Sequence, residues 1–190
     1  MSAVQALAKE ARSKIVVLLG IAGLIDKSLN LGDVVIGDTI IFYEDKVETD
    51  FGTTRRLNAK SVPPWTLDKS GLFFADHGDP ARLTGKDGDQ FKVIPAPIGS
   101  GEAILKAKHH EIRDYLKSMD YRTAVIEKEA AGFLQYFFEE SLDKEVGTEG
   151  IFIIRGVSDL ADPDKDDAYQ EKAAFNAMVT LHEILKSINR

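Results

Sequence analysis

The sequence contains no cysteine, and this absence removes several classes of protein from consideration. A disulfide scaffold, thiolate chemistry and a zinc site of the cysteine type all require that residue. No apolar run approaches the roughly 20 residues that a helix needs to cross a bilayer. Residues 1–13 are of mixed charge and lack the apolar stretch of a signal peptide. These absences predict a cytoplasmic protein with no membrane partner.

Basic residues are also in short supply, with 24 lysines and arginines against 31 aspartates and glutamates. The net charge of −7 argues against a nucleic-acid partner, because such proteins carry a basic face. The 190 residues, 44% hydrophobic and 29% charged, have the composition of an ordinary globular protein. This length suits one domain with a real core, so we expect residues 1–190 to form a single domain.

Strands and helices are expected to alternate along the chain. Runs of β-branched residues predict buried strands at Lys14–Leu19, Asp33–Phe42, Tyr121–Ile126 and from Ile151 onward. Residues 91–98 hold two prolines, which suits either an edge strand or a strand that leads into a loop. Helices are predicted at residues 2–13, 127–138 and 168–187, and from a cap at Ser100 to Lys117. This order predicts an α/β fold around a mixed β-sheet.

Two further segments complete the predicted elements. Residues 44–64 are polar and predict an excursion or hairpin, followed by a short helix at 65–68 and a strand piece at 71–74. The last helix is expected to bury one apolar stripe. Its members are Ala173, Ala174, Ala177, Met178, Leu181, Leu185 and Ile188.

The stretch Ile151–Asp162 ends a buried strand with Ser158 and Asp159. Ligands bind at the carboxyl ends of strands in open α/β sheets, so a carboxylate there is a candidate for chemistry. Asp and Ser are also the usual caps of a helix N-terminus. Both interpretations of Asp159 stay open at this point.

Two other strand ends carry residues of interest. Glu127 and Glu129 stand between a strand and a helix, where acidic residues also complement the helix dipole. The segment from Gly20 to Gly23 lets a ligand approach the backbone, or simply permits a tight turn. The pattern G-x-G-x-x-G is not present, which excludes a Rossmann NAD site. His77 has no metal-spaced partner, and we expect neither a metal nor a cofactor.

Four motifs in series resemble those of the purine nucleoside phosphorylase and nucleosidase superfamily. They are G-I-A-G followed by L-N-L-G-D-V-V-I-G-D (Gly20–Asp38), G-S-G-E (Gly99–Glu102), V-I-E-K-E-A-A-G-F (Val125–Phe133) and R-G-V-S-D-L-A-D (Arg155–Asp162). The likeness covers nearly the whole chain and is strongest to 5′-methylthioadenosine/S-adenosylhomocysteine nucleosidases. It implies a three-layer α/β sandwich and cleavage of the N-glycosidic bond of a purine nucleoside.

The resemblance also implies roles for particular residues. Glu129 would bind the ribose hydroxyls, and Asp159 would donate a proton to purine N7 as the base departs. Burial would keep the Asp159 carboxyl protonated at neutral pH. The remaining residues implied to contact the ligand are Ala22, Gly23, Ile104, Leu105, Ser158 and Tyr169.

The chain departs from the family pattern in three respects. Lys128 replaces the usual methionine, and its ammonium could pair with Glu129 or reach a phosphate or carboxylate of the ligand. No arginine lies in the strand before Gly20, where the phosphorylases hold phosphate. This favours hydrolysis over phosphorolysis and makes inorganic phosphate a co-substrate only in the second case. The opening strands and the glutamate that activates water are not found.

These departures predict a domain that is incomplete at its N-terminus, with a bare sheet edge that a partner chain covers in a homo-oligomer. The sequence thus favours a purine nucleosidase acting on adenosine or a 5′-thioadenosine, with activity lowered by the missing general base. The alternative is a catalytically weak nucleoside-binding sensor module. A third interpretation, an oligomerisation domain in which Asp159 only caps a helix, also stays open.

Overall fold

The computed structural model describes residues 10–11, 13–50, 52–102, 111–140, 148–161 and 169–189. The strands are β1 (Ile15–Leu24), β2 (Val34–Phe42), β3 (Lys46–Thr49), β4 (Gly52–Arg55), β5 (Ala59–Ser61), β6 (Ala81–Thr84), β7 (Gln90–Ser100), β8 (Val125–Glu127) and β9 (Gly150–Asp159). The helices are α2 (Pro64–His77), α3 (Glu111–Met119), α4 (Ala130–Glu140) and α5 (Gln170–Ile188). Of the helix expected at residues 2–13, the structure describes residues 10, 11 and 13; residues 10–11 are helical and Ser13 is not.

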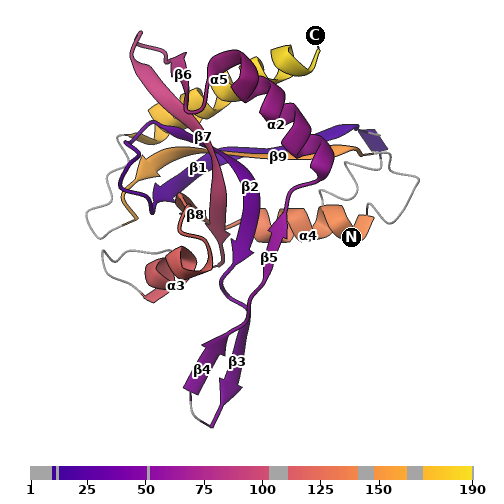
Figure 1. Ribbon diagram of the computed structural model, residues 1–190, viewed down its shortest axis with the longest axis vertical. Coiled ribbons are helices and arrows are strands. Elements are labelled where there is room, and N and C mark those ends of the chain that lie inside the picture. The colour runs from indigo at the N-terminus through magenta and orange to yellow at the C-terminus, as the bar shows by residue number, and fades with distance from the viewer. Residues whose placement is uncertain are drawn as a thin grey trace.

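The central sheet is mixed, as the sequence predicts, and its strand order is β5-β2-β9-β1-β8-β7-β6. Strand β2 also pairs with β7, so that β2, β9, β1, β8 and β7 form a closed ring of strands (Figure 1). Strands β3 and β4 make a separate hairpin that projects from the body of the molecule (Figure 1). The predicted excursion at residues 44–64 is therefore this hairpin together with β5.

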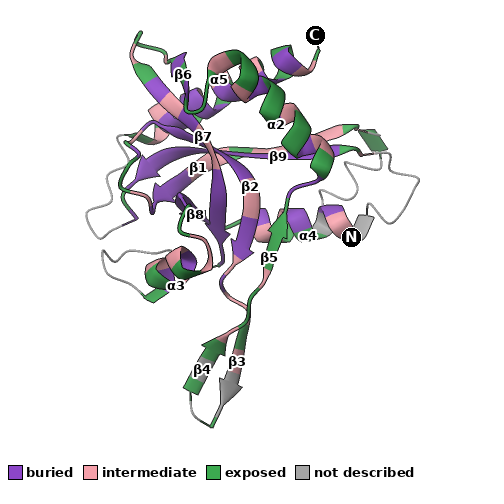
Figure 2. Ribbon diagram, in the orientation of Figure 1, coloured by how far each residue is buried: buried purple, intermediate pink, exposed green. Residues whose placement is uncertain are grey.

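Helices cover the sheet on both sides, which gives the expected three layers (Figure 1). On one side α2 and α5 pack over a core that includes Phe73, Phe152 and Ile184. On the other side α4 closes a second core around Leu134 and Ile153. Strand β9 lies between these two cores, and all its residues are buried (Figure 2). The prediction of a strand buried on both faces is confirmed.

The prediction of an edge strand at residues 91–98 is wrong, because β7 is flanked on both sides. Strand β2 runs along one side of β7. On the other side β6 pairs as far as Val93, and β8 begins only at Ile98. Pro95 and Pro97 fall in the interval between these two partners. A proline has no amide N–H to donate to a neighbouring strand. Between Val93 and Ile98 neither β6 nor β8 pairs with β7, so no such donor is needed on that side.

Residues 64–77 form one helix, so a helix that begins near Trp65 is confirmed but is longer than predicted, and the strand piece at 71–74 is wrong. Pro64 occupies the first turn, where its missing N–H costs nothing. Thr66, Ser70 and Phe73 are the buried residues, and their spacing of four and three is that of a helix face. The apolar run Gly71–Phe74 favours a strand only when these four residues are taken alone, without the helical spacing of Thr66, Ser70 and Phe73.

Helix α5 buries the predicted stripe only in part: Ala173 and Ala177 are buried, and Leu181 and Ile188 pack partly buried against the core. Its buried residues are Ala173, Asn176, Ala177, Thr180, Ile184 and Ser187. Met178 and Leu185 are 49% and 36% exposed. The buried face accepts polar residues because they are bonded: the Asn176 amide donates to the Gly32 carbonyl at 2.8 Å, and the Thr180 hydroxyl to the Asn176 carbonyl at 2.9 Å. No described helix is long and apolar enough to cross a membrane.

One edge of β1 carries no strand partner over most of its length in the described part of the chain. Strand β9 pairs with β1 from Ile15 to Gly23 on one side. On the other side β8 meets β1 only at Gly23 and Leu24. This arrangement agrees with the expected bare edge, and its cover by a partner chain in a homo-oligomer stays a prediction.

Helix α5 presses closely on β9 at Gly156, and this contact gives a testable prediction. A Cβ at position 156 would overlap the backbone carbonyl of Ala173 on α5. We expect Gly156→Ala to lower the free energy of unfolding by about 1–3 kcal/mol, as overpacking does. The matched control is Gly71→Ala, where the new methyl meets nothing within 4 Å and should stabilise α2 by about 0.5–1 kcal/mol. Urea denaturation followed by the fluorescence of Trp65, the single tryptophan, measures both.

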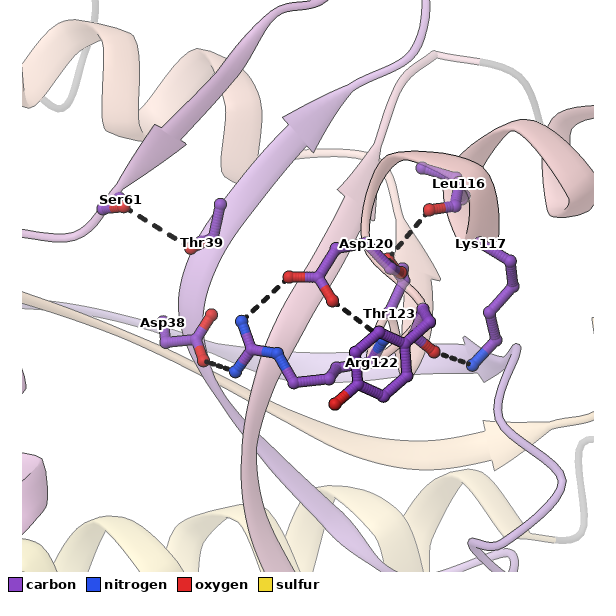
Figure 3. Close-up of polar contacts among 9 residues, drawn as sticks. Asp38, Thr39, Ser61, Leu116, Lys117, Asp120, Arg122 and Thr123 are labelled. Atoms are coloured by element: carbon purple, nitrogen blue, oxygen red, sulfur yellow. Dashed lines mark hydrogen bonds and ion pairs between the residues drawn. The ribbon is translucent and has the colours of Figure 1, made fainter.

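A polar cluster joins the bend of β2 to the turn before β8 (Figure 3). The Arg122 guanidinium donates to Asp38 at 3.0 Å and to Asp120 at 2.8 Å. The Thr123 hydroxyl donates to the Asp120 carbonyl at 2.7 Å. Burial favours the neutral Asp120 carboxyl, but the hydrogen bonds and charge of Arg122 outweigh this and lower the pKa of Asp120. The cluster fixes β2 where its register shifts after Gly37.

The lowered pKa of Asp120 predicts a pH dependence of stability. A depressed carboxyl pKa stabilises the fold above the unfolded value, roughly 3.9, and this contribution disappears as the pH falls through the folded value. We therefore expect Arg122→Met to cost at most about 1 kcal/mol at neutral pH, since Arg122 is 45% exposed. The difference in free energy of unfolding between the unaltered protein and Arg122→Met should vanish as the pH falls below about 4 and through the lowered pKa of Asp120. Denaturation at a series of pH values tests this, and a difference that persists in acid would contradict it.

Candidate functional site

Two predicted site residues lie on either side of the same point of β1. Gly23 pairs with Ile126 of β8 on one side and with Asp159 of β9 on the other. Neighbouring strands are about 4.8 Å apart, so the ends of β8 and β9 are separated by roughly 10 Å across Ala22 and Gly23. The structure thus brings the Glu127–Glu129 segment and Asp159 to one region of the sheet.

A β-bulge sets the position of Asp159. Ala22 pairs with Val157 and Gly23 with Asp159, so Ser158 is the extra residue. The Asp159 carboxylate accepts hydrogen bonds from the Ala161 amide at 2.8 Å and from the Ser158 hydroxyl at 3.0 Å. Asp159 is 8% exposed. It caps the turn after β9 but not α5, whose N-cap is Tyr169, so the helix-cap interpretation is wrong for that helix.

The two glycines of the first motif make room for side chains of β9. Neither has a positive φ, so the tight-turn interpretation is wrong. A Cβ on Gly20 would overlap the guanidinium of Arg155, which pairs with Gly20 across the strands. A Cβ on Gly23 would lie 3.1 Å from the Asp159 carboxylate and 2.7 Å from the Ala161 Cβ. The glycines therefore let Arg155 cross β1 and let Asp159 approach it.

Arg155 is the functional-site residue that the sequence reasoning missed. It is 3% exposed and forms an ion pair with the buried Glu127. The same guanidinium donates to the Glu129 carboxylate at 3.0 Å. A signal was available, since a charged residue within a fully apolar strand requires a buried partner. Arg155 thus links both carboxylates at the end of β8.

Glu127 and Glu129 have different surroundings although they stand two residues apart. The Glu127 carboxylate accepts hydrogen bonds from the amides of Glu129 and Ala130 at 3.0 Å and so caps α4. This confirms the helix-dipole interpretation for Glu127. The Glu129 side chain is 62% exposed and forms an ion pair with the buried Arg155. Of these two residues, only Glu129 has a carboxylate that a ligand can reach from the solvent.

Ser100 caps a different helix from the one expected. It is the last residue of β7, and its hydroxyl accepts a hydrogen bond from the Ala131 amide of α4 at 2.9 Å. The first amides of α4 are therefore taken by Glu127 and Ser100. Tyr43 lies fully buried near this helix start. Burial and the charges of Glu44 and Glu127 raise the pKa of its hydroxyl well above the ordinary value.

A hollow of about 190 Å³ opens beside Glu129. Strands β2 and β5 and the loop before β5 form one wall, and the end of β7 and the first turns of α4 form the other. It is lined by Ile40, Phe42, Asn58, Lys60, Ser100, Gly101, Glu102, Lys128, Glu129, Ala131, Gly132, Leu134 and Gln135. Sites for whole small molecules usually exceed about 300 Å³, so this hollow suits part of a ligand.

Other predicted site residues lie elsewhere. Ile104 and Leu105 fall outside the described residues. Tyr169 lines a second hollow, with Lys86, Asp89 and Lys172, and not the hollow beside Glu129. Ala22 and Ser158 are buried next to Asp159. Among the described residues no three His, Asp or Glu side chains are grouped closely enough to hold a metal ion.

Together these features define a class of protein: an α/β domain whose strand ends gather carboxylates and a buried arginine beside a hollow that fits part of a ligand. The comparison with known families makes this specific. The family model of the phosphorylase superfamily matches residues 1–188. The chain belongs to this superfamily, whose members include nucleoside phosphorylases and nucleosidases.

Individual relatives are similar at low identity. The chain is 24% identical over 197 aligned residues to ATP nucleosidase Cap17 of Escherichia coli, and the match covers 95% of this chain but 37% of that protein. It is 26% identical to the 5′-methylthioadenosine/S-adenosylhomocysteine nucleosidase of Listeria innocua, with 96% of this chain and 74% of the enzyme covered. The corresponding nucleosidase of Colwellia psychrerythraea, solved with adenine, matches with a TM-score of 0.72 at 19% identity, over 97% of this chain and 72% of that one. The nucleoside phosphorylase-like fold is confirmed.

Proposed function

We propose that this chain is a nucleosidase domain that hydrolyses the N-glycosidic bond of a purine nucleoside of the adenosine or 5′-thioadenosine type. The bond between ribose C1′ and base N9 breaks, and water adds its hydroxyl to C1′ and supplies a proton to the products. Glu129 binds the ribose hydroxyls, and Asp159 donates a proton at N7 as negative charge develops on the base. Asp159 is then reprotonated from water.

The observation that carries the proposal is the position of the two carboxylates about β1. Asp159 and the Glu127–Glu129 segment stand on opposite sides of Ala22 and Gly23, roughly 10 Å apart by strand spacing. A nucleoside that lies across these two small residues reaches one carboxylate with its base and the other with its ribose.

The relatives support an adenine-type base. The Listeria innocua relative is named for 5′-methylthioadenosine and S-adenosylhomocysteine, and the Colwellia psychrerythraea enzyme holds adenine. The Cap17 relative is named as an ATP nucleosidase, which again contains adenine.

Release of free base from a panel of nucleosides tests the proposal. The panel contains adenosine, 5′-methylthioadenosine and inosine, each with and without inorganic phosphate, and chromatography detects the base. We expect adenine release that does not depend on phosphate. A strict requirement for phosphate would replace hydrolysis by phosphorolysis. If no nucleoside is cleaved or raises the melting temperature at millimolar concentration, the proposal fails.

A second candidate, a nucleoside-binding module without turnover, is favoured by the carboxylates around the hollow. In the described residues these are Glu102 and Glu129. Glu129 is paired with Arg155, so its carboxylate is already held in place as a binding group for the ligand. Binding of adenosine without release of adenine would support this candidate.

A further inference from the structure

Two lysines of the hollow beside Glu129 have no carboxylate partner. Lys128 lies between β8 and α4, and Lys60 belongs to β5, where it pairs with Ile40 of β2. Neither forms an ion pair with any residue that the structure describes. The Lys60 ammonium lies 5.8 Å from the centre of the Phe138 ring on α4, a cation–π distance.

Most other lysines in the described part of the chain are paired, which makes these two unusual. The pairs are Lys14–Glu149, Lys46–Glu44, Lys69–Asp68, Lys86–Glu171, Lys117–Asp26, Lys172–Asp89 and Lys186–Glu183. Carboxylates outnumber basic groups in the sequence, so a surface lysine usually meets one. The same hollow is lined by Glu102 and by Glu129, which is bound to Arg155, so the two unpaired ammonium groups offer a binding point for an anion within a lining of mixed charge.

The positions of Asp159, Glu129 and the hollow indicate which part of a ligand meets the two lysines. Asp159 stands on one side of Ala22 and Gly23, and the Glu127–Glu129 segment on the other. The hollow begins at Glu129 and continues along α4 as far as Gln135, and Asp159 does not line it. With the base at Asp159 and the ribose at Glu129, the 5′ substituent is the part that enters the hollow.

We infer that the ligand is a nucleoside 5′-phosphate, whose phosphate is bound by Lys60 and Lys128. This inference rests on the proposed function and specifies the 5′ substituent of its substrate. A methylthio group carries no charge and would leave both ammonium groups unpaired. A phosphate or diphosphate supplies the anion that they lack, and lysine binds phosphate as a point charge.

Affinity for matched ligands tests the inference. Isothermal titration at low salt compares adenosine with AMP and ADP. We expect the nucleotides to bind at least about tenfold more tightly than adenosine, because each ammonium–phosphate contact near water contributes a few-fold. Added salt should remove most of this preference by screening. Equal affinity for adenosine and AMP overturns the inference but leaves the proposed function standing, whereas no binding of any of them overturns both.

Variants identify the responsible side chains. The double variant Lys60→Met and Lys128→Met should lose the preference for AMP and keep the affinity for adenosine within about twofold. Lys128→Arg retains the charge and should retain the preference. The control is Lys27→Met, which removes an equally exposed, unpaired charge outside the hollow and should change nothing. A preference that survives in the double variant contradicts the assignment to these lysines.

Inorganic phosphate is the other source of the same chemistry. If millimolar phosphate competes with AMP and also accelerates adenine release from adenosine, the lysines bind a phosphate co-substrate, and the inference of a 5′-phosphate is overturned. We expect phosphate neither to accelerate release nor to compete at that concentration.

Discussion

Replacement of Asp159 by asparagine is expected to lower the rate of adenine release by about 10²- to 10⁴-fold, the usual contribution of a general acid. The amide has the shape of the carboxyl group but carries no proton to transfer to N7. Its oxygen can still accept the hydrogen bond from the Ala161 amide, so the turn after β9 should stay intact. Adenine release at saturating substrate measures the effect, and nucleoside binding should change much less.

Asp26→Asn is the matched control for this change. The Asp26 carboxylate accepts a hydrogen bond from the Ser28 amide two residues on, at 2.9 Å, as Asp159 does from Ala161. It lies in the turn after β1 and does not line the hollow beside Glu129. We expect its activity to equal that of the unaltered protein. Full activity in Asp159→Asn would remove Asp159 from the proposed mechanism.

Replacement of Arg155 by methionine is expected to cost about 3–5 kcal/mol of unfolding free energy. The change leaves the buried Glu127 carboxylate without its cation, and an uncompensated buried charge is among the most costly defects in a fold. Urea denaturation followed by Trp65 fluorescence measures it. Removal of both charges, in Arg155→Met with Glu127→Gln, should cost less than the sum of the single changes, because the two residues are in contact.

Arg122→Met provides the comparison for Arg155. Arg122 also bridges two carboxylates, Asp38 and Asp120, but it is 45% exposed, so solvent screens the pair and the expected cost is at most about 1 kcal/mol. If the two arginine variants lose the same free energy, burial does not determine the strength of the Arg155 pair. Loss of Arg155 should also raise the concentration of adenosine needed for half-maximal binding, because Glu129 loses its support.

Local patterns predicted those elements whose own residues decide their structure. The apolar run from Ile151 identified β9, and the polar residues 44–64 identified the hairpin of β3 and β4. The strand at β7 and the helix at α5 were also predicted, but the position of β7 within the sheet and the full buried face of α5 were not, because neighbouring elements decide them. Pro95 and Pro97 fit within the sheet because β6 ends before them and β8 begins after them. Asn176 is buried on α5 because Gly32, distant in sequence, accepts its hydrogen bond.

The candidate site likewise contains residues that the sequence predicted and one that it did not. Glu129 and Asp159 were found from strand ends and from the family resemblance, which the superfamily match confirms at the level of the fold. Arg155 was not found, although its charge within an apolar strand marked it. The partner of a buried charge cannot be derived from spacing along one strand, since Glu127 belongs to another strand of the sheet. The glycine at position 20 was noted, but its role depends on the Arg155 side chain that passes over it.

By itself the sequence determined the class of fold and the superfamily and predicted the two carboxylates of the site, because hydrophobic period and short motifs are local properties of the chain. Only the tertiary structure decided the register that places Asp159 and the Glu127–Glu129 segment on either side of Gly23. It also decided the ion pair of Arg155 and the hollow that holds Lys60 with Lys128. Each of these joins residues far apart in the chain, and such contacts form only when the strands pair and the helices pack against them.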